Sequence, residues 1–79
     1  MTQKPAIGRI VHYFPRTEEL HANNLTLPIA AVITAVWSEQ RVNLKLIMDG
    51  PEDRWRTSVS LLPAESEDPA GFWVWPPRV

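Results

Sequence analysis

Two runs of alternating apolar and polar residues, at 41–48 and 54–62, constrain the fold of this 79-residue chain more than any other feature. Because successive side chains of a β-strand point to opposite faces, each run predicts a strand with one buried face. In the first run the apolar face consists of Val42, Leu44, Leu46 and Met48. In the second run the corresponding face consists of Trp55, Thr57, Val59 and Leu61, with Arg54, Arg56, Ser58 and Ser60 opposite. The turn sequence Asp49-Gly50-Pro51 separates the two predicted strands.

Three further segments are predicted to be strands, at 7–14, 29–37 and 72–75. The first and the last are rich in β-branched and aromatic residues and are followed by proline. The middle segment is almost continuously apolar. Its three alanines would permit a helix, but its short length and four β-branched aliphatic residues favour a buried strand. Residues 16–28 are predicted to form a long loop, with one helical turn at 17–21.

Five short strands at this spacing predict an all-β fold, a small five-stranded antiparallel barrel with a long first loop. The layout resembles an SH3-like or Tudor-like barrel. We expect a single domain over residues 1–79, with an N-terminal arm at 1–6 and a C-terminal tail at 76–79. The predicted core contains Ile10, Val32, Val42, Leu44, Leu46, Val59 and Leu61.

The composition disfavours several classes of partner. Eight Lys and Arg against nine Asp and Glu give a net charge of −1, whereas proteins that track long nucleic acids usually carry a clear basic excess. No apolar run approaches the ~20 residues of a membrane span. Residues 1–9 lack the apolar core of a signal peptide. We therefore expect a cytoplasmic protein that binds neither a membrane nor extended nucleic acid.

Residues suited to catalysis or metal binding are scarce. The chain has no cysteine and two histidines, His12 and His21, which are too few for a structural zinc site. No nucleophile or paired-acid motif has catalytic spacing, and the three glycines are isolated, so no glycine-rich phosphate loop is present. We therefore expect no enzyme activity, no catalytic residue, no metal and no cofactor.

Tryptophan is over-represented, with four residues in the chain. Trp73 and Trp75 share one face of segment 72–75, and the residues on its other face are apolar as well. Residues 29–37 are also apolar on both faces. One small barrel has a single interior, so the loop at 16–28 or a second subunit must cover the other faces. We favour a homo-oligomer that has at least one of Trp37, Trp73 and Trp75 at its interface.

Arginine lies beside aromatic residues at three places: Arg54-Trp55-Arg56, Trp75-Pro76-Pro77-Arg78, and Arg9 with Tyr13 on one face of the first predicted strand. Guanidinium groups bind phosphate through paired hydrogen bonds, and aromatic rings stack on bases. The combination therefore suits a nucleotide-like ligand. In the alternative interpretation, Trp55 belongs to the core and its two arginines form a solvated outer face.

Four segments resemble a family of small phage and prophage proteins: GRIVHYFP at 8–15, AAVITAVWSEQRVNLKLIMDG at 30–50, TSVS at 57–60 and FWVWPPR at 72–78. They cover most of the chain in order, and the closing Trp-x-Trp-Pro is the most distinctive piece. The resemblance implies a phage-encoded accessory protein of a family that is mostly of unassigned function. By analogy of size and setting, one role for such a protein is an anti-defence sponge, an oligomer that sequesters a nucleotide immune signal. At Val74 the chain departs from the commonest pattern, which has histidine there, so no ligand role is transferred to that position.

These observations predict a non-catalytic protein of the host cytoplasm that binds a nucleotide-type ligand. Because a barrel of this size fills its interior with side chains, we expect the site between subunits or under the loop at 16–28. The candidate binding residues are Arg54, Arg56 and Arg78 for phosphate, and Tyr13, Trp55, Trp73 and Trp75 for stacking. One alternative is a protein–protein module, either a minor virion component or an inhibitor of a host protein. A nucleic-acid-binding barrel is a further alternative, which the charge balance weakens.

Overall fold

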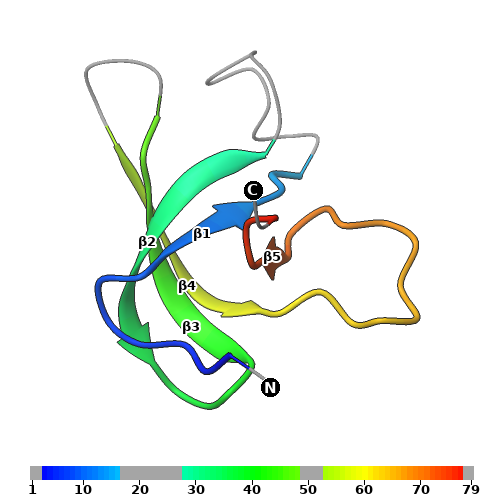
Figure 1. The fold of residues 1–79 in the computed structure, drawn as a ribbon. Helices are drawn as coiled ribbons and strands as arrows, with labels where there is room; N and C mark the ends of the chain where they lie inside the picture. The colour runs from blue at the N-terminus through cyan, green and yellow to red at the C-terminus, as the bar shows by residue number, and fades with distance from the viewer. Residues whose placement is uncertain (1–2, 17–27, 49–52, 78–79) are drawn as a thin grey trace.

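A curled sheet of five strands forms the protein in the computed structural model, which describes residues 3–16, 28–48 and 53–77 (Figure 1). The strands are β1 (Ile10–Tyr13), β2 (Ile29–Val36), β3 (Arg41–Leu46), β4 (Arg54–Ser60) and β5 (Trp73–Val74). They lie in the order β4-β3-β2-β1-β5, and each neighbouring pair is antiparallel. This arrangement confirms the predicted small all-β barrel of five antiparallel strands.

Each observed strand lies inside a segment that the sequence predicts to be a strand, and each ends one or two residues before the predicted end. Residues 29–36 form a strand despite their alanines, because they pair with β1 on one side and β3 on the other. The predicted helical turn at 17–21 and the turn at 49–51 lie outside the described residues. Among the residues that are described, none belongs to a helix that could span a membrane.

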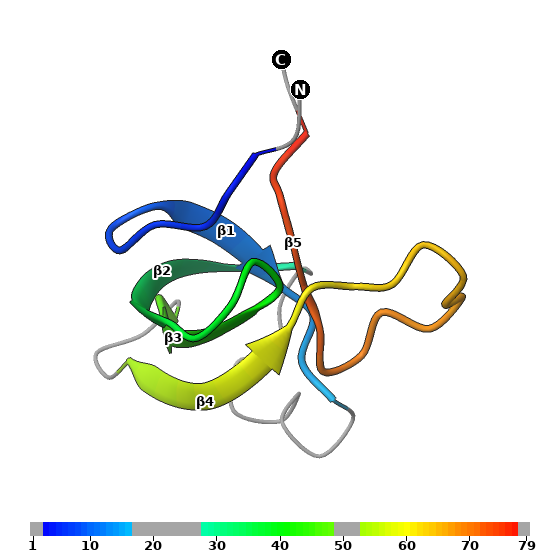
Figure 2. The same cartoon turned by 90° about the horizontal axis from the view of Figure 1, so that it is seen from below.

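Contacts between the end of β4 and β5 bring the two ends of the sheet together (Figure 2). Leu61 follows β4 and forms a parallel bridge with Trp73, and the Leu62 amide donates to the Trp73 carbonyl at 3.0 Å. The Gln40 carbonyl accepts hydrogen bonds from the Leu61 amide at 2.7 Å and from Trp73 Nε1 at 3.1 Å. The turn between β2 and β3 therefore ties β4 to β5 and closes this end of the barrel.

Buried side chains from all five strands fill the interior. Trp73 is the largest of them and has no exposed surface. The full set is Val11, Tyr13, Ile29, Ala31, Ile33, Val42, Leu44, Leu46, Val59 and Trp73, with Met48, Leu61 and Trp75 packed against it. The predicted core positions on β3 and β4 are confirmed, and Leu61 is half-buried at the margin.

The core prediction is wrong for Ile10 and Val32. These two residues lie opposite each other on the outer face of the sheet, and Ile10 is 46% exposed. In β1 the bulky ring of Tyr13 lies inside, so Ile10, an odd number of positions away, points outward. Apolar residues occupy successive positions in β1 and β2, so the sequence pattern there does not indicate which face is buried.

Two β-bulges flank Asn43 in the middle of β3. The register between β2 and β3 shifts between Ile33 and Ala35, and the register between β3 and β4 shifts between Val42 and Leu44. Bulges increase the local twist and bend of a strand. Their position on both sides of β3 therefore accounts for the strong curl of the sheet seen in Figure 2.

The side-chain amide oxygen of Asn43 accepts hydrogen bonds from the segments next to the two bulges. Asn43 Oδ1 accepts hydrogen bonds from Trp37 Nε1 at 2.9 Å, from Thr57 Oγ1 at 3.0 Å and from the Ser58 amide at 2.8 Å. Ser58 has a φ of 53°, a left-handed conformation that is uncommon for residues other than glycine. Asn43 is only 8% exposed, and because its neighbours Val42 and Leu44 face the core, its side chain links the β2–β3 turn to β4 on the outer side of the sheet.

The bulge in β4 exchanges the two faces of that strand. Arg56 lies opposite the fully buried Leu44 and so belongs to the inner face, while its neighbour Trp55 belongs to the outer face and is 55% exposed. Beyond the bulge, Val59 is buried. The prediction of uninterrupted alternation, with Trp55 and Val59 on one face, is therefore wrong.

We expect Leu44→Ala to lower the free energy of unfolding by roughly 2–5 kcal/mol, because it leaves a cavity at a fully buried position. Chemical denaturation measures the change. Ile7→Ala is the control, since Ile7 is 72% exposed, and should stay within about 0.5 kcal/mol of the wild type. A loss below about 1 kcal/mol for Leu44→Ala would contradict its place in the core.

We expect Asn43→Ala to lower the free energy of unfolding by about 1–3 kcal/mol, because three donors lose their shared acceptor. Asn43→Asp keeps an acceptor oxygen at the same place and should retain more stability at neutral pH. Denaturation curves compare the two variants, and the NMR signal of the Trp37 indole N–H reports the hydrogen bond directly. Equal losses in both variants would show that the bulges do not depend on this acceptor.

Candidate ligand pocket

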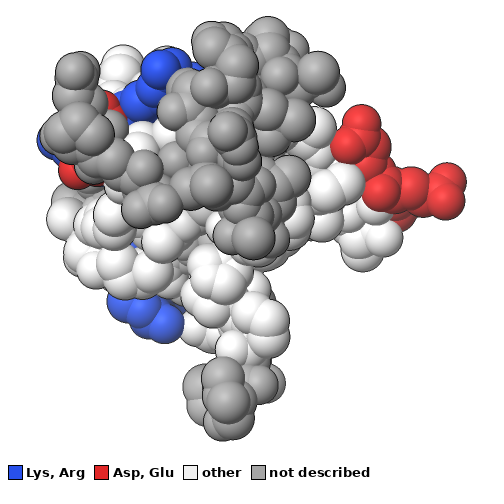
Figure 3. All heavy atoms as spheres, turned by 90° about the horizontal axis from the view of Figure 1, so that it is seen from above, with Lys and Arg blue, Asp and Glu red and all other residues white. Residues whose placement is uncertain are grey.

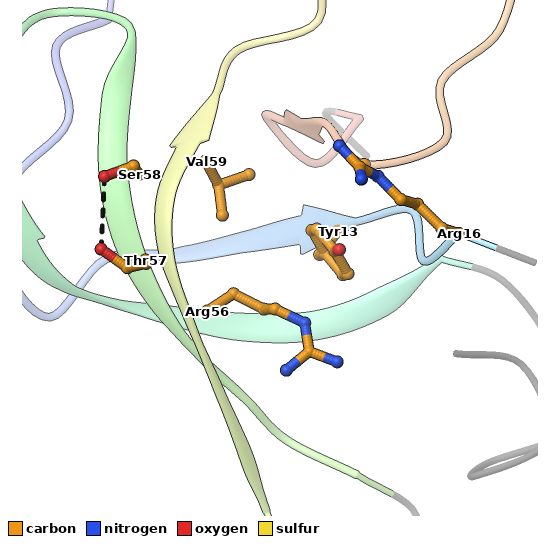
Figure 4. Close-up of a pocket in the computed structure, with 7 residues that line it drawn as sticks. Tyr13, Arg16, Arg56, Thr57, Ser58 and Val59 are labelled. Carbon is orange, nitrogen blue, oxygen red and sulfur yellow. Dashed lines mark hydrogen bonds between the residues drawn. The ribbon is translucent and has the colours of Figure 1, made fainter. Parts of the chain in front are cut away.

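A pocket of about 360 Å³ opens between β4 on one side and the end of β1 with the residues before β5 on the other (Figure 4). This volume falls within the range of about 300–1,000 Å³ that is usual for small-molecule sites. The residues that line it are Tyr13, Arg16, Arg56, Thr57, Ser58, Val59 and Gly71. Residues more than fifty positions apart in the sequence thus meet where the barrel is not closed by backbone pairing.

Two arginines reach the pocket from different elements. Arg56 points to the inner face because the bulge in β4 comes directly after it, and Arg16 follows the end of β1. Figure 4 shows their guanidinium groups on either side of Tyr13. Each guanidinium carries five N–H donors in a planar arrangement suited to phosphate or carboxylate oxygens. These three side chains also take part in interactions within the chain, so a ligand would join an existing cluster.

Tyr13 contributes little ring surface to a ligand. It is only 3% exposed, because its ring packs in the core. Stacking of a base on Tyr13, which the sequence suggests, would therefore need a rearrangement of the pocket. The planes of the two guanidinium groups are the alternative stacking surface, since arginine stacks on aromatic rings.

Gly71 allows Arg16 to lie against the backbone before β5. A Cβ atom at this position would stand 2.7 Å from Arg16 Nε, and Gly71 has a φ of +85°, which disfavours any other residue. The Gly71 amide donates to the Phe14 carbonyl at 2.7 Å, which fixes the strand end that carries Arg16. Gly71 therefore positions one of the two cationic groups of the pocket.

The hydroxyl groups of Thr57 and Ser58 on β4 are bonded to each other and to Asn43. Thr57 Oγ1 donates its single proton to Asn43 Oδ1, so in its 3.2 Å contact with Ser58 Oγ the serine is the donor (Figure 4). Both side chains lie on the other side of β4 from Tyr13, Arg16 and Arg56 (Figure 4). Thr57 and Ser58 therefore belong to the hydrogen-bond network of Asn43, and the charged wall of the pocket is formed by the two arginines.

Of the predicted binding residues that the structure describes, Arg56 and Tyr13 line this pocket. Arg54 and Trp55 are exposed on β4 without lining it, and Arg78 lies outside the described residues. Among the described residues, Arg16 and Arg56 converge on the pocket, whereas Arg54 does not.

The two C-terminal tryptophans have structural contacts. Trp73 lies in the core with no exposed surface, so it is available neither to a ligand nor to a subunit interface. Trp75 is half-buried and meets Trp73 edge to face, with ring centroids 5.1 Å apart. The Arg9 guanidinium lies 5.1 Å from the centroid of the Trp75 ring and also donates to Gln3 Oε1 at 2.9 Å. Arg9 thus joins the N-terminal arm to the C-terminal segment.

The sequence analysis did not single out Arg16, Gly71, Thr57 or Ser58 as site residues. Arg16 stands at the start of the long loop, where the site was expected, but nothing in the sequence pairs it with β4. The signal for the bulge is weak: a polar Asn43 on an alternating strand and a Thr-Ser pair on the next. The pocket therefore arises from a local irregularity that regular alternation does not predict.

The acidic side chains described in the loop after β4 lie away from the pocket. Glu65, Glu67 and Asp68 are exposed in the loop after β4, and Figure 3 shows acidic atoms at the tip of this loop, on the right, projecting from the body of the molecule. None of them lines the pocket. Among the described residues, no group of three His, Cys, Asp or Glu side chains is placed to hold a metal ion.

Comparison of the sequence with protein-family models gives no match, and comparisons with curated proteins and with solved structures give none either. The resemblance to small phage proteins therefore stays a prediction, and the functional argument rests on the fold and the pocket.

Proposed function

We propose that this protein is a non-catalytic binding protein that holds a small phosphorylated ligand of nucleotide type in the pocket between β4 and the end of β1. The observation that carries the proposal is the position of Arg16 and Arg56 on either side of Tyr13, in a pocket of about 360 Å³. Charge-assisted hydrogen bonds from guanidinium to phosphate contribute about 1.5–3 kcal/mol each. Two such groups supply most of the affinity.

The chemistry of the pocket favours binding over turnover. Hydrolysis of a phosphate ester needs a general acid, a base or a metal ion near the reacting atoms. The described lining residues contain neither histidine nor a carboxylate. Arginine stays protonated at all physiological pH values and so serves as a fixed cation rather than as a proton carrier.

The biological role that we propose is sequestration. A phage-encoded accessory protein with such a pocket would withdraw a nucleotide-type immune signal from the host cytoplasm without destroying it, as an anti-defence sponge does. The pocket lies within one chain. Ligand capture in this proposal therefore needs no second subunit, unlike the inter-subunit site that the sequence suggests.

We expect at least one member of a panel of linear and cyclic mono- and dinucleotides to bind with a Kd below ~100 μM in calorimetry. The matched nucleoside without phosphate should bind at least about tenfold more weakly. Arg16→Ala and Arg56→Ala should each weaken binding by roughly tenfold or more, because each removes a charge-assisted contact worth at least about 1.4 kcal/mol. Raising the salt concentration should also weaken binding, since the contacts are ionic.

Arg54→Ala is the matched control, because Arg54 is two positions away on the same strand but does not line the pocket. It should change the affinity by less than about threefold, which corresponds to under 0.7 kcal/mol. If no nucleotide binds below ~100 μM, or if both pocket variants bind like the wild type, the proposal fails. The protein–protein module then becomes the preferred function.

A further inference from the structure

The outer face of the sheet carries a continuous row of side chains that crosses four strands. The register places Ile10 opposite Val32, Val32 opposite Lys45, and Lys45 opposite Trp55. Residues directly opposite in antiparallel strands share a face. Because Val11, Ala31 and Leu44, which neighbour this row along their strands, are fully buried, the row lies on the outside of the barrel.

Several large apolar side chains on this face are exposed. Trp55 is 55% exposed, Ile10 46% and Ile47 43%. Single exposed apolar residues are normal on a protein surface, but a contiguous group marks an interaction site. The register makes this group contiguous, since Ile47 lies two positions beyond Lys45 on the same face of β3.

Four residues at the end of the β3–β4 hairpin form what we call the outer patch: Lys45, Ile47, Asp53 and Trp55. Lys45 lies opposite Trp55, and the register continues through Leu46 opposite Arg54, which brings Ile47 beside Asp53. The Asp53 carboxylate accepts a hydrogen bond from the Met48 amide at 3.2 Å, which holds it at this position. The two charged residues thus occupy one diagonal of the patch, and the two apolar residues occupy the other.

We propose that the outer patch is the interface between two copies of this chain. A two-fold axis along the Trp55–Ile47 diagonal brings Lys45 onto the partner's Asp53, and Asp53 onto the partner's Lys45. The same axis places Trp55 against the partner's Trp55. Self-complementarity of this kind is the requirement for a symmetric dimer, and the opposite charges on one diagonal select a second copy as the occupant.

The remainder of the row, Val32 and Ile10, lies on the Lys45 side of the axis, beyond the four residues of the patch. A dimer that is stable in solution buries about 1,200–2,000 Å² in total, and in this proposal the patch is the centre of that area. The ligand pocket lies on the inner side of β4, where Arg56 points away from the face that carries Trp55. The dimer therefore leaves both pockets open, and it is independent of the proposed function.

Analytical ultracentrifugation of the full chain at micromolar concentration tests the proposal. The wild type should sediment as a dimer of about 18 kDa, twice the 9.0 kDa of one chain. Trp55→Ala should weaken dimerisation at least tenfold, whereas Trp37→Ala should leave it unchanged. Trp37 is the matched control, because it is 63% exposed but lies outside the outer patch.

A charge exchange tests the geometry itself. Lys45→Asp and Asp53→Lys should each weaken dimerisation at least tenfold, because each brings like charges together across the axis. The double variant carrying both changes should recover dimerisation to within about threefold of the wild type. Circular dichroism and thermal unfolding verify that each variant is folded before it is compared.

A wild-type monomer at 100 μM would overturn the proposal, and so would a dimer that Trp37→Ala breaks and Trp55→Ala does not. Failure of the double variant to recover would overturn the arrangement of the two charges about the axis. Nucleotide affinity should be the same in Trp55→Ala as in the wild type. The outcome for the dimer can therefore be separated from the outcome for the pocket.

Discussion

One side-chain oxygen, Oδ1 of Asn43, organises the irregular part of this barrel. It accepts hydrogen bonds from the indole of Trp37, the hydroxyl of Thr57 and the backbone amide of Ser58. The turn after β2 and the middle of β4 are thereby attached to β3 at the points where the registers shift. A buried amide is stable here because its acceptor is satisfied several times over, and the unusual backbone of Ser58 is held by the same contact.

The bulge in β4 changes which of its side chains share a face of the strand. Before the bulge, Arg56 faces the interior and Trp55 faces outward. After the bulge, Val59 is buried, although regular alternation would place it on the same face as Trp55. The guanidinium Nη1 of Arg56 also donates to the carbonyl of Trp55 at 2.9 Å, which occupies a backbone acceptor of this edge strand. Bulges and charged residues are the usual means by which edge strands avoid uncontrolled pairing. The same features give β4 a cationic inner side and an aromatic outer side.

The position of the pocket follows from where the barrel is closed and where it is open. The Gln40 carbonyl ties the end of β4 to the buried indole of Trp73, so the sheet closes around the largest core residue. Toward the start of β4 no such contact is described between this strand and β1, and the lining side chains of Arg16 and Arg56 occupy that side. The pocket is thus a consequence of incomplete closure in a barrel whose interior is otherwise filled with side chains.

The sequence by itself determined the strand number, the strand order along the chain and the buried face of β3, because alternation in 41–48 and the flanking turn residues are local signals. Residue chemistry alone also selected Arg56 and Tyr13, which the structure places in the lining of the pocket. Only the tertiary structure decided that Ile10 and Val32 point outward. A run of successive apolar residues does not indicate which face of a strand is buried, and the pairing between strands determines that face. Likewise, the exchange of faces in β4 and the meeting of Arg56 with Arg16 and Gly71 depend on hydrogen bonds between residues far apart in the chain, which no local pattern encodes.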